Sequence, residues 1–279
     1  MTYRDALREG SSSLQASGSD TPYLDALVLL TDVSGIAKEQ LYARLTESVD
    51  AVALERFLTL IERRGRGFPI AYLIHRQEFF GREFYVDERV LIPRADTEIL
   101  IETALRVADE DPSLERIHDL GTGSGCIALT LKAERPALLV SASDISHDAC
   151  EVFRINAGRL GLELPLTEAP FFRSLNGPFD IVVSNAPYLT DNEVQAMDAR
   201  GWPEPQGALR AGNEGLDCIE QIIAESVHYL RESGRLILEA APAQMPIISE
   251  MMRRAGFGGL TVGADLAGRD RVVSGVRNG

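Results

Sequence analysis

The chain has 279 residues, with 45% hydrophobic and 25% charged side chains and a formal net charge of −14. This composition is typical of a folded globular protein, and the length suits one large domain or two moderate ones. The acidic balance argues against a protein that wraps a nucleic-acid backbone, because such affinity comes largely from Lys and Arg side chains on phosphates.

The sequence predicts a cytoplasmic protein without a membrane partner. No apolar run reaches the roughly 18 residues that a membrane-spanning helix needs. Residues 1–10 are polar and charged, so we expect no signal peptide. Cys126, Cys150 and Cys218 are odd in number and widely spaced, which predicts reduced thiols and no metal site.

Residues 1–85 are predicted to form a small helical domain. Thr21 and Pro22 are typical of a helix start, with Thr21 as the cap and Pro22 at the first helical position. A second amphipathic helix is predicted over about 51–64. It ends in a stretch rich in Arg and Gly, which favours ordinary helix capping over RNA binding. A helical domain without a catalytic polar cluster is typical of partner recognition or of a lid.

A hairpin and an α/β domain are predicted to follow. Alternating β-branched and aromatic residues begin near residue 76 and predict a two-stranded connector with its turn at Gly81-Arg82. From about residue 97 the pattern alternates between helix and strand, as in a mostly parallel sheet covered by helices. Strands near 259–263 and 271–276 predict an antiparallel C-terminal edge. We therefore expect an α/β domain over residues 86–279.

A glycine-rich turn lies between the predicted strand 115–120 and the helix 125–134. It reads Asp119-Leu120-Gly121-Thr122-Gly123-Ser124-Gly125-Cys126. Glycines at such a turn let backbone N–H groups approach a ligand at the positive end of a helix. The spacing does not fit the dinucleotide fingerprint, because position 126 is Cys126, and no Gly-Lys-Ser/Thr of a phosphate-binding loop is present. Asp119 beside the loop favours a positively charged sulfonium cofactor over a pyrophosphate.

Two other predicted strands end in polar residues. Asp144 follows the strand after the glycine turn, at a place where an acid can hold two ribose hydroxyls. Strand 179–184 ends in Asn185-Ala186-Pro187-Tyr188. The Asn185 carboxamide oxygen and the Ala186 backbone carbonyl offer two acceptors, and Tyr188 offers a flat apolar face. This arrangement predicts recognition of the NH2 group of an amide or an aromatic amine, with catalysis by positioning and electrostatics.

These motifs resemble those of the release-factor glutamine methyltransferases of the HemK/PrmC type. The run from Asp119 to Cys126 is similar to the S-adenosylmethionine loop of class I methyltransferases, and Asn185 to Tyr188 is similar to the Asn-Pro-Pro-Tyr motif. Further similar stretches are Pro69–Tyr72, Arg76–Gly81, Leu91–Glu98, Glu204-Pro205, Ala208-Leu209, Gly215-Leu216 and Asp265–Arg269. The chain departs from the family pattern at Ala186, which replaces a proline, and at Pro170, which replaces an acid.

The resemblance implies a Rossmann-like domain that transfers a methyl group from S-adenosylmethionine to a glutamine amide. The glutamine would be that of the Gly-Gly-Gln motif in peptide chain release factors, and residues 1–85 would recognise the release factor. The implied cofactor contacts are Asp119, Gly121, Thr122, Gly123, Ser124 and Gly125 around the methionine part, Asp144 at the ribose, Phe171 at the adenine, and Asn185. Asn185, Ala186, Pro187 and Tyr188 would bind the glutamine and carry catalysis. We expect a monomer that meets nucleic acid only through the translation machinery.

Three other functions stay open on the sequence. The chain would methylate a glutamine of a ribosomal protein, or an adenine amine of DNA or RNA, or it would bind the cofactor without turnover. Residues 1–85 hold 10 of the 28 basic and 12 of the 42 acidic side chains, so residues 86–279 carry a net charge of −12. That charge disfavours the nucleic-acid substrate.

Overall fold

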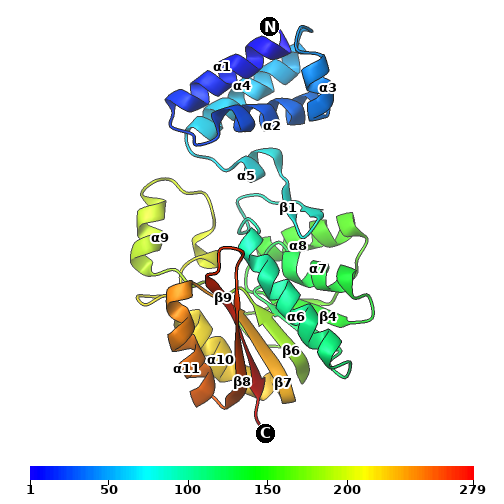
Figure 1. Cartoon of the computed structure of the whole chain (residues 1–279), viewed down its shortest axis with the longest axis vertical. Coiled ribbons are helices and arrows are strands. Elements are labelled where there is room, and N and C mark those ends of the chain that lie inside the picture. Colours follow the sequence, from blue (N-terminus) through cyan, green and yellow to red (C-terminus); the bar gives the residue numbers. More distant parts are fainter. The chain divides into compact units, whose positions relative to one another are not determined.

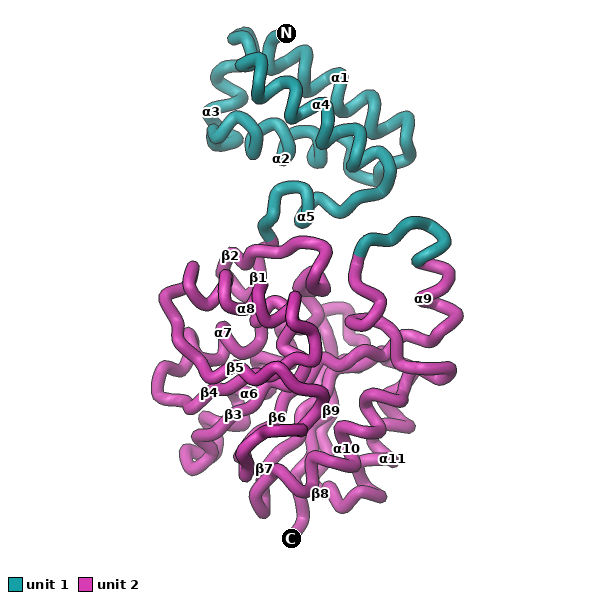
Figure 2. Tube along the Cα trace, turned by 180° about the vertical axis from the view of Figure 1, so that it is seen from behind, with its two compact units in different colours: residues 1–76, 198–203 teal, residues 77–197, 204–279 magenta.

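A computed structural model describes residues 1–279, which divide into two compact units. Unit 1 comprises Met1–Arg76 and Asp198–Pro203, and unit 2 comprises Gln77–Met197 and Glu204–Gly279 (Figure 2). The hairpin that the sequence predicts as a connector therefore belongs to unit 2. None of the helices combines the length and the apolar character that crossing a membrane requires.

Unit 1 is a set of helices around one apolar core (Figure 1). The helices are α1 (Tyr3–Ala16), α2 (Pro22–Ser34), α3 (Lys38–Ala43), α4 (Ala51–Gly65) and α5 (Ile70–Ile74). Leu14, Leu30 and Phe57 are fully buried in the core. Gly10 lets α1 approach α4, because a Cβ at this position would lie 2.6 Å from the Phe57 ring.

The start of α2 differs from the predicted cap. Pro22 occupies the start of the helix as predicted, and Thr21 precedes it. The Thr21 side chain, however, accepts no hydrogen bond from the helix backbone. Its hydroxyl donates instead to the Asp25 carboxylate one turn later, at 2.9 Å.

Unit 2 is built on a seven-stranded sheet in the order β5-β4-β3-β6-β7-β9-β8. The strands are β3 (Arg116–Leu120), β4 (Leu139–Asp144), β5 (Leu166–Glu168), β6 (Phe179–Ser184), β7 (Leu230–Glu239), β8 (Phe257–Ala264) and β9 (Asp270–Arg277). The pairings from β5 to β7 are parallel, and β9 is antiparallel to both β7 and β8. The predicted α/β fold with an antiparallel C-terminal edge is confirmed.

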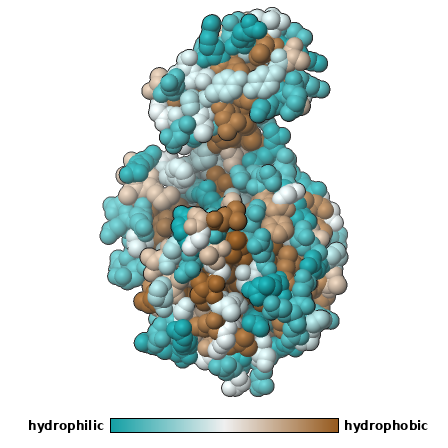
Figure 3. Space-filling view, viewed as in Figure 1, coloured by the Kyte–Doolittle hydropathy of each residue, from teal (hydrophilic) through white to brown (hydrophobic).

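Helices cover both faces of this sheet. They are α6 (Glu98–Glu110), α7 (Cys126–Glu134), α8 (His147–Leu160), α10 (Asp217–Tyr229) and α11 (Met245–Arg254). The helix α9 (Asp191–Asp198) lies in the connection between β6 and β7, and short 3-10 turns lie at Ala95–Thr97, Gln206–Ala208 and Pro242–Gln244. Ile181 and Val183 of β6 pack in the core with α6 and α7, whereas Val182 packs with α10 and α11. This alternation follows from the two-residue period of a strand. On the face shown in Figure 3, hydrophilic side chains surround apolar ones over the exposed sheet edge.

The hairpin consists of β1 (Gln77–Phe79) and β2 (Arg82–Phe84). Its turn residues are Phe80 and Gly81, one position earlier than predicted, and both have positive φ angles of 51° and 68°. Two successive positive φ angles suit the two-residue turns that match the twist of a hairpin. The carboxylate of Glu98 accepts the backbone N–H of Phe80 at 2.8 Å, which supports this strained residue.

Candidate functional site

The strands of the parallel part of the sheet end together at one edge. Leu120 of β3 pairs with Ser143 of β4, and Ser184 of β6 pairs with Leu238 of β7. The Ser184 hydroxyl also donates to the Leu120 carbonyl at 2.7 Å. The residues that follow these pairs are Gly121, Asp144, Asn185 and Glu239. The glycine turn, the acid and the amide motif thus lie at the same level of one edge, where open α/β sheets bind their ligands.

The glycine turn has the conformation that its sequence predicts. Gly121, Gly123 and Gly125 all have positive φ angles, and α7 begins directly after Gly125. A Cβ at Gly125 would lie 2.7 Å from the Phe153 ring and 2.8 Å from Leu129, so only glycine fits. Gly121 and Gly123 instead face open space, with nothing within 4 Å of an added Cβ. The turn therefore leaves room for a ligand against its backbone.

Asp119 lies completely buried beneath this turn. Its Oδ2 accepts from the Thr122 hydroxyl at 2.6 Å and from the Ala128 N–H at 3.1 Å. Its Oδ1 is buried without a hydrogen-bond partner. Burial, and to a smaller extent the nearby charge of Asp144, raise the pKa of Asp119 to about 7. A ligand that brings positive charge to this position would stabilise the ionised form.

Asp144 is held by backbone N–H groups at the end of β4. Its Oδ2 accepts from Gly123 at 2.8 Å and its Oδ1 from Ser146 at 2.9 Å. Burial raises its pKa although these hydrogen bonds lower it. The Asp144 carbonyl accepts the N–H of Ala169. Phe171 comes two residues after Ala169 in the sequence. Phe171 is partly buried and has a positive φ of 47°.

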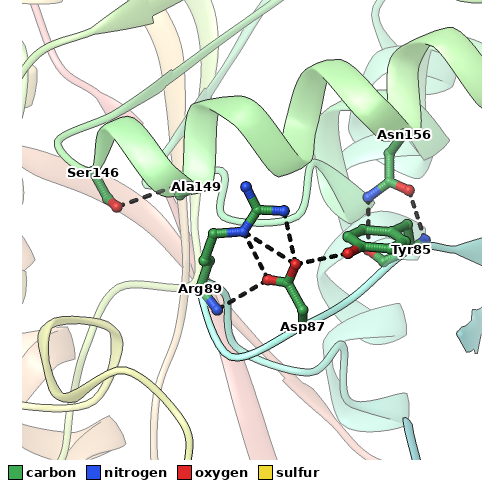
Figure 4. A network of polar contacts seen from close by, with 6 residues as sticks. All are labelled: Tyr85, Asp87, Arg89, Ser146, Ala149 and Asn156. Atoms are coloured by element: carbon green, nitrogen blue, oxygen red, sulfur yellow. Dashed lines mark hydrogen bonds and ion pairs between the residues drawn. The ribbon is translucent and has the colours of Figure 1, made fainter. Parts of the chain in front are cut away.

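Asn156 of α8 ties the glycine turn to the chain before it, a contact that the sequence analysis did not identify. Its Nδ2 donates to the carbonyls of Ser124 at 2.8 Å and Tyr85 at 3.0 Å, and its Oδ1 accepts from the Tyr85 N–H at 2.7 Å. Figure 4 shows that Asp87 in turn binds the Tyr85 hydroxyl and the Arg89 guanidinium. A buried Asn within a helical pattern gives no sequence signal of such a partner.

The amide motif lies on the neighbouring strand end. Asn185 donates from Nδ2 to the Thr97 hydroxyl at 3.1 Å, and Ala186 is buried. The Tyr188 carbonyl accepts from Gln244 Nε2 at 3.0 Å, which fixes the backbone of the motif. Burial raises the pKa of Tyr188, with Glu239 as the next cause. Neither Thr97 nor Gln244 was among the predicted site residues.

Asn185, Ala186 and Tyr188 line one pocket, whereas Pro187 is not part of its lining. The empty space of the pocket, counted out to its open mouth, is about 510 Å³, and its lining is Leu91, Arg94, Asn185, Ala186, Tyr188, Leu189, Met197, Glu204, Ala208 and Leu209. Arg94 donates to both carboxylate oxygens of the buried Glu204 at 2.6 Å. This pair joins two stretches that carry the family resemblance, although their contact was not predicted.

Two further titratable groups of the sheet are buried. Glu239 at the end of β7 is 2% exposed, and burial raises its pKa to about 7. His118 of β3 is 1% exposed, and burial lowers its pKa to about 4. The His118 ring bonds to the hydroxyls of Ser141 and Ser143, both at 2.9 Å. His118 is therefore a buried strand residue whose ring is held between two serine hydroxyls.

Comparisons with known proteins agree with this geometry. Residues 5–74 match the family described as PrmC N-terminal domain, and residues 95–200 match the Methyltransferase small domain. The chain is 36% identical over 281 residues to the release factor glutamine methyltransferase of Deinococcus radiodurans, with 100% of both chains covered. It is 38% identical over 275 residues to that of Moorella thermoacetica, with 97% of both covered.

Solved structures share the fold at low sequence identity. The hMettl16 catalytic domain superposes with a TM-score of 0.56 at 16% identity, covering 82% of this chain and 84% of that one. The ribosomal protein L11 methylase of Lactobacillus delbrueckii subsp. bulgaricus gives a TM-score of 0.50 at 19% identity, covering 73% and 90%. At such identities the likeness shows the methyltransferase fold alone.

Proposed function

The chain belongs to the release factor glutamine methyltransferases, and from this premise we propose that it methylates the Gly-Gly-Gln glutamine of peptide chain release factors. The site of the reaction is the sheet edge at which β3, β4, β6 and β7 end, called here the strand-end edge. The observation that carries the proposal is the position of Asn185 and Ala186 in one pocket, at the same sheet level as the glycine turn. Two acceptors in that pocket suit an NH2 group, and the turn beside them suits a cofactor.

The residues around the turn fit S-adenosylmethionine. Gly121 and Gly123 leave open space, and Asp119 keeps a buried oxygen without a partner. The segment from Asp119 to Cys126 contains no Lys or Arg that would favour a phosphate. We assign Asp119 and residues Gly121, Thr122, Gly123, Ser124 and Gly125 to the methionine part, Asp144 to the ribose and Phe171 to the adenine. The bound cofactor supplies an electrophilic methyl group on a positively charged sulfur.

The protein acts on the glutamine by holding its amide. The Asn185 carboxamide oxygen and the Ala186 carbonyl accept the two N–H bonds, and the Tyr188 ring lies against the amide plane. Pro187 fixes the backbone between them. An amide nitrogen is a weak nucleophile, so these contacts act by orienting it and by stabilising the positive charge that develops there. The proton that the nitrogen loses passes to water.

We assign residues 1–85, the helices of unit 1 together with the hairpin of unit 2, to recognition of the release factor. The match of residues 5–74 to a PrmC N-terminal domain supports this assignment. The three free cysteines and a substrate of the translation machinery favour a cytoplasmic enzyme that contacts nucleic acid only through that machinery.

The test is a methyl-transfer assay with labelled S-adenosylmethionine and a purified bacterial release factor. Mass spectrometry of the digest locates the modified residue. A single methyl group on the Gly-Gly-Gln glutamine, and none on a release factor with that glutamine changed to alanine, is the expected result. Transfer to a ribosomal protein or to adenine in its place, or cofactor binding without transfer, would contradict the proposal.

A further inference from the structure

Glu239 is a buried acid that the mechanism above does not use. It ends β7 directly beside Asn185, because the preceding residues of β6 and β7, Ser184 and Leu238, are paired. Its side chain is almost completely buried, and its Oε2 has no hydrogen-bond partner. Burying a carboxyl oxygen without a hydrogen-bond partner is unfavourable, so the presence of Glu239 here calls for an explanation.

Thr97 joins Glu239 to the amide motif. Thr97 is 2% exposed, and its Oγ1 lies 3.1 Å from Asn185 Nδ2. Hydrogen bonds from Thr97 and Asn185 act on the Glu239 carboxyl and lower its pKa, against the larger raising effect of burial. The three side chains come from the turn before α6, the end of β6 and the end of β7. They form one polar chain behind the pocket.

The hydrogen bonds among these three side chains run in one direction. An ionised carboxylate only accepts hydrogen bonds, so the Thr97 hydroxyl proton points to Glu239. The Thr97 oxygen is then free to accept, and the Asn185 group facing it is the NH2 that donates. The Asn185 oxygen consequently faces the other way, which is the orientation that the NH2 of a substrate amide requires. In the flipped orientation, an NH2 group would face another NH2 group.

We propose that Glu239 and Thr97 are positioning residues that fix the Asn185 carboxamide with its oxygen toward the substrate glutamine. The inference rests on the proposed role of Asn185 as the acceptor for that glutamine. Glu239 sets the direction of these hydrogen bonds, and it acts on Asn185 both directly and through Thr97. The negative charge of Glu239 also lies behind the position at which the nitrogen becomes positive.

The ionisable groups around Glu239 are either paired with other groups or uncharged at neutral pH. Arg271 is the cation that faces it, and Arg271 pairs with Asp96 at 2.9 Å and with Asp265 at 3.2 Å. Arg271 therefore lowers the pKa of Glu239 while Asp96 raises it. The other titratable groups that the charge of Glu239 affects are Tyr188 and Cys126. Burial raises the pKa of each, and Glu239 raises it by a smaller amount. Neither of them carries a charge at neutral pH.

A matched set of threonine variants tests the chain. Thr97→Val keeps the side-chain shape without the hydroxyl, and we expect kcat to fall roughly 10- to 100-fold. Thr97→Ser keeps the hydroxyl and restores kcat to within about threefold of the original enzyme. The control is Thr130→Val in α7, where an equally buried hydroxyl has no partner, and its kcat stays unchanged.

Glu239→Gln tests the acid itself, because an amide can donate to Thr97 and reverse the chain. We expect kcat to fall roughly 10- to 100-fold while thermal stability stays equal or rises, since the change removes a buried charge without a full set of partners. A purely structural role would lower stability as well. If this variant does not fold, the Thr97→Val and Thr97→Ser pair decides the question.

The pH dependence of kcat distinguishes an ionisable positioning residue from a residue that only packs. Burial raises the pKa of Glu239 to about 7, and below that pH the protonated acid loses the fixed direction. The kcat of the original enzyme should fall as the pH drops through about 7, and this fall should be absent in Glu239→Gln. Difference infrared spectroscopy of the free enzyme should show a carboxyl titrating near the same pH that the variant lacks.

The outcomes separate this inference from the proposed function. If Asn185→Ala loses activity while Thr97→Val and Glu239→Gln keep kcat and its pH dependence, the inference is wrong and the proposed function stands. If Asn185→Ala keeps its full rate, the inference and the proposed role of Asn185 are both overturned, and methyl transfer to the release factor still tests the proposed function separately. Loss of kcat in all three variants, with rescue by Thr97→Ser, supports the inference.

Discussion

The two sides of the strand-end edge hold their polar groups by different means. On the side of β3 and β4, Asp144 accepts from two backbone N–H groups, and the Gly121 and Thr122 N–H groups bond to the Ser143 carbonyl. On the side of β6 and β7, Asn185 depends on the Thr97 side chain, with Glu239 behind it. The first side is organised by backbone conformation, whereas the second is organised by contacts between side chains.

This difference predicts that changes on the first side affect cofactor binding and that changes on the second side affect kcat. A backbone network tolerates most side-chain changes. The exceptions are glycines that must keep a positive φ and the side chains that bond to the turn, such as Asp144 and Asn156, and loss of the network should weaken cofactor binding. A side-chain network fails when one member is removed, and its loss should lower kcat at saturating cofactor. Cys126 is affected from both sides of the edge. Burial raises its pKa, and the charges of Asp119 on the first side and Glu239 on the second also raise it.

The largest expected effect is on the side-chain network. Asn185→Ala removes the acceptor for the substrate NH2, and we expect kcat to fall roughly 10²- to 10³-fold, as for other preorganised groups in a buried site. The dissociation constant of the cofactor, measured by calorimetry, should change far less. Asn176→Ala, at an exposed loop position, is the control and should keep its rate. A variant at Asn185 that keeps most of its rate would remove this residue from the mechanism.

The next effect tests the backbone network. Gly125→Ala places a Cβ 2.7 Å from Phe153 at a φ of +83°, so it adds both overpacking and backbone strain. We expect a loss of roughly 2–4 kcal/mol in the free energy of unfolding, together with weaker cofactor binding. Gly161→Ala has a similar φ of +65° but open space, and it should lose only about 1 kcal/mol. Equal losses in denaturant unfolding would show that crowding at Gly125 is unimportant.

The same contrast explains what the sequence could predict. The glycine turn, Asp144 and the Asn185 motif each lie within a short stretch that directly follows a strand, so a local pattern carries them. The alternation of strand and helix is also local, and it predicts the sheet and its antiparallel edge. Thr97 and Glu239 are separated from Asn185 by 88 and 54 positions, and nothing local marks them as its partners. Asn156, Gln244 and the Arg94–Glu204 pair were missed for the same reason.

A smaller effect concerns stability and pH. Burial raises the pKa of Asp119 from 3.8 to about 7, so the folded protein keeps a proton that the unfolded chain loses. This contribution makes the free enzyme less stable as the pH rises from about 4 to about 7. Asp119→Asn should remove it, which changes the pH dependence of the unfolding free energy by roughly 3 kcal/mol over that range.

The measurement is a difference between variant and original enzyme at each pH. His118, whose pKa burial lowers to about 4, acts in the opposite sense between pH 4 and 6.5, and it does so in both proteins. Glu239 contributes with the same sign as Asp119 and is also present in both. A constant difference between the two unfolding curves would show that Asp119 titrates alike in the folded and unfolded chain.

The smallest effect isolates cofactor affinity. Asp144→Asn keeps one acceptor oxygen but turns an NH2 group toward the N–H of either Gly123 or Ser146, and it removes the charge proposed to hold the ribose. We expect the dissociation constant of S-adenosylmethionine to rise about 10-fold in calorimetry. Asp148→Asn, an exposed acid in the first turn of α8, makes the same charge change and should leave affinity unaltered. The kcat of Asp144→Asn at saturating cofactor should stay close to that of the original enzyme. If it falls as far as in Asn185→Ala, the two sides do not act separately, and Asp144 must influence the orientation of the substrate amide through the turn that it holds.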